Sequence, residues 1–255
     1  MRSELRIELR RGTDGSVRAS GNLATPPYWC RWDGATLWIV GSAACPVGQD
    51  DITFTLDVGP GVTADVRGVA ATIVYTATGE GTSIRTRLVV GDGAALHWAP
   101  EPVIVTALAR HRSCTEVHAA EGATVRVDET LVLGRQGETS GVISSGVVVA
   151  RDGATVLRSS FDTGLPGWDG PGGTDGADVV GTRLLLGPSH GSSPVEVAPT
   201  PPLRADLPPD RPASAPRATV LRTEHGDRLV VAVGDSPAQV AARLDAIAVP
   251  SHADC

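Results

Sequence analysis

The sequence contains no lysine: all 22 of its basic residues are arginine, against 29 Asp and Glu, which gives a formal net charge of −7. Chemistry that depends on a lysine, such as a P-loop nucleotide site or a Schiff base, is therefore excluded. An acidic chain without a basic cluster also lacks the electrostatic character of proteins that bind nucleic acid or anionic membranes. We therefore expect no nucleic acid and no membrane among its partners.

Aromatic residues and long apolar runs are also scarce. Phe, Trp and Tyr make up 4% of the 255 residues whereas hydrophobic residues reach 41%, so Val, Leu, Ile and Ala must build the core. No apolar segment approaches the roughly 20 residues that a membrane-spanning helix needs. Residues 1–11 alternate charged and apolar side chains and so do not resemble a secretory signal. The sequence predicts a cytoplasmic protein.

The four cysteines are few, far apart and irregularly spaced, with no Cys-x-x-Cys pair: Cys30, Cys45, Cys114 and Cys255. In a chain of this length without a secretory signal, such spacing favours reduced thiols over a disulfide framework. This agrees with the cytoplasmic location expected above.

Glycine and proline are abundant, with 30 and 19 residues, which indicates many turns and disfavours a helical bundle. Asp-Gly, a dipeptide typical of tight hairpin turns, occurs six times, and strand-like runs flank it at 33–34, 92–93 and 152–153. Residues 52–58 alternate apolar and polar side chains with a period of two, the pattern of a half-buried strand. Up to about residue 160 the sequence therefore predicts successive antiparallel strands.

The composition then changes. Residues 164–178 are rich in glycine and residues 188–217 hold nine of the nineteen prolines. Neither stretch suits a central strand or a helix interior. We expect a Gly/Pro-rich surface excursion at about 164–217 within a single domain over 1–255.

The C-terminal part predicts a last hairpin, with strands at 218–223 and 228–233, and then a helix. Ser236, Pro237 and Gln239 form an N-terminal capping signature. The apolar stripe of this helix is Val240, Leu244 and Ile247. The predicted fold class is all-β, mainly antiparallel, closed by one C-terminal α-helix.

Three residues of one short segment, His111, Cys114 and His118, are of types that bind zinc or nickel. On a helix they would share one face, but the flanking residues predict a strand. There Cys114 and His118 share one face and His111 points to the other. The pattern favours solvent-facing histidines beside a buried thiol over a metal site.

The segment Gly234-Asp235-Ser236 is similar to the nucleophile region of a Gly-Asp-Ser lipase. Such an enzyme needs most of an α/β domain after the serine, with an Asp and then a His. Here only nineteen residues follow, and His252 precedes Asp254. Helix capping explains Ser236 without chemistry, so no catalytic residue is predicted.

Four segments occur in an order that resembles the urease accessory protein family UreD, also called UreH. Residues 41–50 (Gly-Ser-Ala-Ala-Cys-Pro-Val-Gly-Gln-Asp) are similar to the family's Pro-Leu-Gly-Gly-Asp signature through Pro46, Gly48 and Asp50. Gln49 stands at the second glycine of that signature, and Cys45 replaces another common glycine. Residues 58–61 followed by 69–72 resemble the family's next pair of strands.

The third and fourth segments are the more specific. Residues 91–102 are similar to Gly-Ala-x-Leu-x-Trp-x-Pro-x-Pro, with Trp98 and Pro100 in place, and include Glu101. Residues 128–138 begin with Asp128 and Glu129 and match Leu-Gly-Arg-x-Gly-Glu through the residues Gly134, Arg135, Gly137 and Glu138. The resemblance covers about residues 40–160 firmly and continues to the final helix, in the style of actinobacterial members.

The resemblance implies a maturation factor that is not an enzyme. It would act as a chaperone-like scaffold with UreF and the GTPase UreG on apo-urease and assist nickel insertion. GTP hydrolysis would belong to UreG, in keeping with the missing lysine. The implied fold is elongated, β-rich and poor in helix, and nickel would pass in transit without being bound as a stable cofactor.

A metal in transit needs ligands that release it, and nickel accepts carboxylate, imidazole and water. The candidates for a polar path are the family-matched acids together with one acid between two prolines: Asp50, Asp128, Glu129, Glu138 and Glu101. Arg135 would orient Glu138 or Asp128 through a charge-assisted pair. Alternatively, these acids cap turns.

A different function, a β-sheet binding module for carbohydrate or protein, also stays open, although few aromatics are present to stack on sugars.

Overall fold

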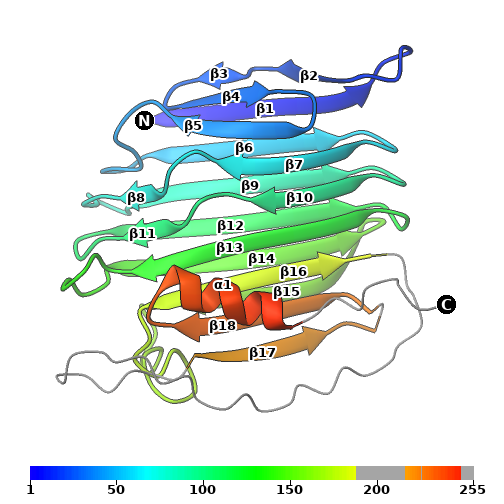
Figure 1. The fold of residues 1–255 in the computed structure, drawn as a ribbon. Coiled ribbons are helices and arrows are strands. Elements are labelled where there is room, and N and C mark those ends of the chain that lie inside the picture. The colour runs from blue at the N-terminus through cyan, green and yellow to red at the C-terminus, as the bar shows by residue number, and fades with distance from the viewer. Residues whose placement is uncertain (188–215, 225, 248–255) are drawn as a thin grey trace.

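The computed structural model of the chain describes residues 1–187, 216–224 and 226–247 (Figure 1). The first of its two sheets contains, in spatial order, β15 (Ala154–Asp162), β14 (Val142–Arg151), β12 (Arg110–Ala119), β9 (Thr82–Val90), β6 (Asp51–Val58), β1 (Arg2–Arg11) and β2 (Val17–Gly21). The second contains β17 (Arg217–Arg222), β18 (Arg228–Gly234), β16 (Val179–Leu186), β13 (Thr124–Leu133), β10 (Ala95–Ala99), β7 (Thr63–Gly68), β5 (Thr36–Gly41), β4 (Tyr28–Trp32) and β3 (Ala24–Thr25). The short strands β8 (Thr72–Val74) and β11 (Val103–Val105) extend it beside β13.

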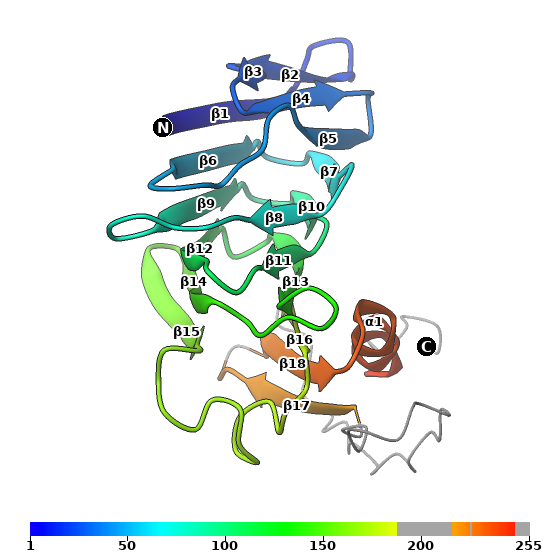
Figure 2. The ribbon, with the colours of Figure 1, turned by 90° about the vertical axis from the view of Figure 1, so that its left-hand side faces the viewer.

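The middle of both sheets is parallel, so the prediction of mainly antiparallel strands is wrong there. In the first sheet β1, β6, β9, β12 and β14 pair in parallel. In the second sheet β5, β7, β10 and β13 do the same. In this middle part the chain passes from one sheet to the other, directly after β6, β9, β12 and β13 and by way of β8 and β11 after β7 and β10, and Figure 2 shows the resulting two columns side by side. The strands joined by the tight turns after β6, β9 and β12 therefore lie in different sheets, on opposite sides of the core.

The turn at Asp92–Gly93 shows why the hairpin prediction failed. It joins β9 to β10, which lie in different sheets. One strand of each sheet, with the connections that join them, makes one coil of the chain. The turn at 92–93 stacks on the corresponding turn of the preceding coil, which follows β6: Gly61 N donates to Asp92 O at 3.0 Å and Gly91 N to Val58 O at 2.9 Å. Alternating side chains reveal which face of a strand is buried, whereas backbone bonds between turns decide which strand lies beside it.

Antiparallel pairing is found at the ends of the sheets, where the other predicted hairpins are confirmed. β4 pairs with β5, β14 with β15, and β17 with β18. The single helix, α1 (Pro237–Ala246), starts as predicted, with Ser236 accepting a hydrogen bond from Gln239 N. No helix among the described residues is long and apolar enough to cross a membrane. The all-β class with one C-terminal helix is confirmed.

The predicted excursion at 164–217 is interrupted by a buried strand. Residues 164–178 form successive turns, held by bonds such as Thr174 N to Trp168 O at 2.8 Å. β16 then runs through the second sheet between β13 and β18, with six of its eight residues buried. Its Val-Val-Gly-Thr-Arg-Leu-Leu-Leu sequence has the β-branched and aliphatic content of a central strand. Residues 188–215 of the excursion lie outside the described residues.

The core between the sheets is aliphatic, as the composition requires. Leu5, Leu56, Leu88 and Leu184 are all at most 1% exposed there. A second apolar layer lies on the outer face of the second sheet, where Val240 and Leu244 of α1 pack over buried residues of β16 and β18. In Figure 1, α1 covers only the lower part of that face. The described helix thus leaves the outer face from β10 to β4 uncovered.

Candidate functional site

A cavity of about 110 Å³ lies between the two sheets. Apolar side chains such as Ile52, Phe54 and Leu131 form much of its wall. Its polar lining comes from β9, β10, β12 and β13 and from the segment after β10; the principal residues are Thr86, Trp98, Glu101, His111, Thr115 and Glu129. The cavity is smaller than ordinary ligand pockets and has room for an ion or a few water molecules.

Glu129 is the acid of this cavity. On β13 it follows the inward-facing Val125 and Val127 by the two-residue strand period. Thr115 Oγ1, on β12 of the opposite sheet, donates a hydrogen bond of 2.6 Å to Glu129 Oε1. Burial raises the pKa of Glu129, and the hydrogen bonds from Thr115 and Trp98 offset this only in part. The cavity therefore favours the neutral carboxyl more than water does, and a bound cation would shift this balance toward the carboxylate.

His111 Nε2, in the same lining, is buried without a hydrogen-bond partner among the described residues, whereas the indole of Trp98 interacts with the Glu129 carboxyl. His111 Nδ1 shares a hydrogen bond of 2.8 Å with Thr82 Oγ1, which fixes the ring. Burial lowers the pKa of His111 to about 4, so the imidazole is neutral at neutral pH and can ligate a metal ion. A buried nitrogen without a partner is costly, which marks His111 as a distinctive residue of the cavity.

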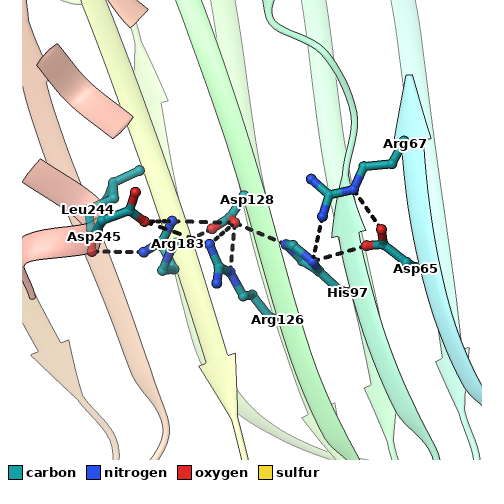
Figure 3. A network of polar contacts seen from close by, with 8 residues as sticks. All are labelled: Asp65, Arg67, His97, Arg126, Asp128, Arg183, Leu244 and Asp245. Atoms are coloured by element: carbon teal, nitrogen blue, oxygen red, sulfur yellow. Dashed lines mark hydrogen bonds and ion pairs between the residues drawn. The ribbon is translucent and has the colours of Figure 1, made fainter. Parts of the chain in front are cut away.

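Asp128, next to Glu129 in sequence, lies on the opposite face of β13, outside the core. Its carboxylate is 3.1 Å from His97 Nε2 and accepts hydrogen bonds from Arg126 Nε at 2.7 Å and Arg183 Nε at 2.6 Å. Burial raises the pKa of Asp128, but these three contacts outweigh it and hold the pKa well below its usual range. Arg183 Nη1 also donates to Leu244 O at 2.8 Å. Figure 3 shows this line of contacts from β7 to α1, which makes Asp128 part of the helix anchor.

The family model for the UreD urease accessory protein matches residues 4–249 of the chain. The chain belongs to the UreD family. A protein named urease accessory protein UreD from Parafrankia sp. (strain EAN1pec) is 33% identical over 225 residues, covering 77% of this chain and 75% of that protein. Its counterpart in Frankia casuarinae is 36% identical over 173 residues, covering 63% of this chain and 54% of that protein. The resemblance inferred from the four sequence segments is confirmed.

The first UreD segment forms the turn before β6. Asp50 is 6% exposed there; its Oδ1 lies 2.7 Å from the α-amine of Met1, and its Oδ2 accepts from Val47 N at 3.0 Å. Gly48 has a φ of +66°, which suits glycine. Pro46 and the buried Cys45 precede it, and the side chain of Gln49 lies against Gly79. Asp50 thus closes a turn away from the cavity lining.

The last UreD segment forms a loop after β13. Arg135 Nε donates to Glu138 Oε2 at 2.8 Å and Arg135 Nη2 donates to Glu138 Oε1 at 3.1 Å. Of the two partners predicted for Arg135, the structure therefore shows Glu138 and not Asp128. The hydrogen bond from Arg135 lowers the pKa of Glu138 to about 2. Gly134 (φ +100°) packs against the Glu138 carbonyl, and Gly137 has a φ of +75°. This pair stabilises the loop.

The third UreD segment supplies the cavity wall and its rim. Trp98 lies in the wall, where its ring packs 5.4 Å from that of Phe54. Pro100 and Glu101 follow as part of the lining, with Glu101 exposed to solvent and its backbone packed closely against Gly68. Of the five acids predicted for a polar path, the structure therefore places two, Glu101 and Glu129, on one cavity.

The three residues considered as metal ligands on β12 do not converge. The strand alternation places Cys114 and His118 on the face opposite His111, as predicted for a strand. The expectation of solvent-facing histidines beside a buried thiol is wrong for His111, which is 1% exposed, and for Cys114, which is only partly buried. The described residues contain no group of three or more His, Cys, Asp or Glu that could hold a metal ion. Burial raises the pKa of the Cys114 thiol, which makes it a poor ligand at neutral pH.

The residues missed by sequence reasoning are Thr115 and, in its cavity role, His111. Both lie in phase with the inward positions Val117 and Ala119 of β12. The predicted strand already places His111 and Cys114 on opposite faces, and the phase of Val117 and Ala119 would have shown that the face of His111 is the buried one. The lipase-like Ser236 caps α1, and His252 and Asp254 lie outside the described residues.

Proposed function

We propose that the chain is a non-catalytic scaffold of urease maturation, acting in the cytoplasm with UreF and the GTPase UreG to insert nickel into apo-urease. The observation that carries this proposal is the UreD family match over residues 4–249. The relatives are named as urease accessory proteins, a role distinct from the hydrolysis that urease performs. The absence of lysine leaves GTP hydrolysis to another component.

Nickel is the cargo in this proposal, and the cavity between the sheets supports a route for it. Glu129 and His111 offer a carboxyl and a neutral imidazole inside, and Glu101 offers a carboxylate at the rim. These are donors that nickel accepts, and their small number favours release over retention. Three of the five predicted acids make structural contacts instead: Asp50, Asp128 and Glu138. Of those five acids, the proposed route therefore keeps Glu101 and Glu129.

Deletion of the gene in its ureolytic host tests the proposed function. Urease subunits should remain abundant, while the nickel content of purified urease, measured by elemental analysis, should fall because insertion fails. Expression of the wild-type chain from a plasmid should restore the nickel content. Urease with a normal nickel content in the deletion strain, at ordinary external nickel, would contradict the proposal.

Glu129→Gln tests the route through the cavity. The substitution keeps the shape and the hydrogen bond from Thr115 but removes a carboxylate ligand, so urease activation in the complemented strain should fall by about tenfold. Glu138→Gln, on the loop after β13, is the matched control and should activate urease normally. UreF binding, checked by co-purification, should survive both changes. Full activation by Glu129→Gln would show that nickel does not use this carboxyl group.

A further inference from the structure

The outer face of the second sheet carries an exposed apolar and cationic surface at the end away from α1. Its strands are β4, β5 and β7, which lie in the upper part of Figure 1, whereas α1 lies near the lower end. We call it the Trp–Arg patch, and it consists of Trp29, Arg31, Trp38, Val40, Arg67 and Val69.

The strand register arranges the patch in two rows. Trp29 lies opposite Val40, and Val69 continues this row because its backbone N–H bonds to Ile39 O at 3.0 Å. The second row is Arg31, Trp38 and Arg67, which are consecutive cross-strand partners. The residues between these positions, such as Leu37 and Val66, are 0% exposed in the core. Side chains of one strand alternate between faces, so both rows point outward.

The exposure of the apolar row is unusual for this molecule. Trp29 is 59% exposed and Val69 58%, although the chain has only five Trp and buries Trp98 almost fully. Each apolar side chain left in water forgoes roughly 25 cal/mol for every Å² that a partner could cover. Trp and Arg are also the residue types most enriched among those that dominate binding at protein interfaces.

The charge of the patch indicates the kind of partner. The patch contains two arginines and no carboxylate in a chain whose net charge is −7. The acids at its border are already engaged: Asp33 Oδ2 accepts from Trp38 Nε1 at 2.9 Å, and Asp65 Oδ2 accepts from Arg67 Nε at 2.8 Å. Asp65 also lies 3.0 Å from His97 Nδ1, at the end of the line of contacts in Figure 3. Arg67 is therefore already paired with Asp65, and a carboxylate supplied by a partner is complementary to Arg31.

We propose that the Trp–Arg patch is the docking surface for a protein of the urease assembly that presents apolar side chains bordered by Asp or Glu. The inference rests on the proposed function for the assembly to which this partner belongs. The apolar row of the patch would be covered by the partner's apolar side chains. Arg31 would meet a partner carboxylate, with the two-bond geometry that a guanidinium favours.

The test uses the full chain with a C-terminal affinity tag, co-expressed with the urease subunits, UreF and UreG of its own gene cluster. The variant Trp29→Ala/Arg31→Glu removes the anchor and reverses one charge at exposed positions. Recovery of the co-purified assembly should fall by about tenfold or more, as for the loss of an interface anchor. The matched control, Leu108→Ala/Arg112→Glu, changes an exposed leucine and an exposed arginine outside the patch and should recover the assembly as the wild type does.

Each other outcome overturns the proposal. If the variant recovers the assembly like the wild type, or the wild-type chain recovers none of it, the patch is not its docking surface. If the wild-type chain alone sediments as a dimer that the variant abolishes, the occupant is a second copy of this chain. The nickel content of urease in the deletion strain separates this result from the proposed function, because it tests maturation without reference to the patch.

Discussion

At the scale of single residues, Arg151 shows how one side chain joins distant parts of the chain. Its Nε donates to Asp227 Oδ2 at 2.9 Å, and the two side chains are 9% and 0% exposed. Its other nitrogens bond to Gly187 O at 2.9 Å and Glu121 O at 3.2 Å. Arg151 ends β14 of the first sheet, while Asp227 precedes β18 of the second, so the pair fastens the two sheets at this end.

Asp227→Asn should destabilise the protein strongly, because it leaves the buried guanidinium of Arg151 without its counter-charge. We expect the free energy of unfolding to fall by about 3–5 kcal/mol in urea denaturation. Arg18→Ala breaks an exposed pair with Asp14 and should leave the free energy of unfolding almost unchanged. Equal effects of the two substitutions would show that the Arg151–Asp227 pair contributes no more than a surface contact.

His111 should give the protein a defined pH dependence. Burial lowers its pKa from 6.5 to about 4, so between these values the folded state binds fewer protons than the unfolded state. The stabilisation is fully present above pH 6.5 and is lost as the pH falls toward 4, at up to about 1.4 kcal/mol per pH unit. Urea denaturation of the wild type and His111→Gln across this range measures the difference.

The quantity to compare is the difference in the free energy of unfolding between the wild type and His111→Gln, because the pH dependence due to Glu129 has the opposite sign. Its pKa is raised from 4.5, so the folded state binds more protons above that pH, and this contribution to stability shrinks as the pH rises. Both proteins contain Glu129, and its contribution largely cancels. Parallel pH profiles of the wild type and His111→Gln would contradict a buried neutral imidazole.

At the scale of elements, the contact between β16 and α1 depends on a missing side chain. A Cβ at Gly181 would collide with Val240 Cγ1 and lie 3.2 Å from Leu244 Cδ1. Gly181 lies between Val180 and Thr182 in a buried strand, so the glycine is explained by the close approach of the helix.

Gly181→Ala should push α1 away from the sheet and lower the free energy of unfolding by about 1–3 kcal/mol. Amide hydrogen exchange in α1 should accelerate, and the double variant Gly181→Ala/Val240→Ala should cost less than the sum of the single variants. The double variant is the control, because Val240→Ala restores space for the methyl group that Gly181→Ala adds. Strict additivity would place the cause of any destabilisation elsewhere.

The elements also show what the sequence could and could not predict. Strand alternation, Asp-Gly hairpins and the capping signature of α1 are local, and the structure confirms β6, the β4–β5 and β14–β15 hairpins and the helix. The parallel coil is set by stacked turns at 59–62, 91–94 and 120–123, whose bonding partners are far apart in sequence. The recurrence of these turns at similar spacing was a signal for the coil that the hairpin interpretation overlooked.

In the candidate site, too, the sequence predicts what depends on local patterns and not what depends on contacts between distant residues. The two-residue period separates Asp128 from Glu129 and predicts that the second faces inward. It cannot predict that Thr115 of the opposite sheet meets Glu129, because that contact depends on the register of the coil. The pairing of Arg135 with Glu138 was predictable because the two residues are three positions apart in one loop.

At the scale of the whole molecule, several strand edges and one apolar surface are exposed. β2 and β15 are the edge strands of the first sheet, β17 is an edge of the second, and the Trp–Arg patch is exposed. Strand edges and apolar patches promote association of an isolated protein.

We expect the chain to be poorly soluble when expressed alone and better recovered with UreF. The measurement is the soluble fraction with and without UreF, with an unrelated co-expressed protein as the control for expression load. A monodisperse, soluble monomer whose yield does not depend on UreF would contradict this expectation.

The coil also makes the molecule a spacer of set length. Each turn of the coil adds one strand to both sheets and so lengthens the stack by about 4.8 Å. The Trp–Arg patch lies toward one end and α1 near the other, with β10 and β13 between them. A relative with one coil more or fewer would hold these two surfaces one strand spacing farther apart or closer together. The number of coils therefore fixes the distance between whatever binds at the two ends.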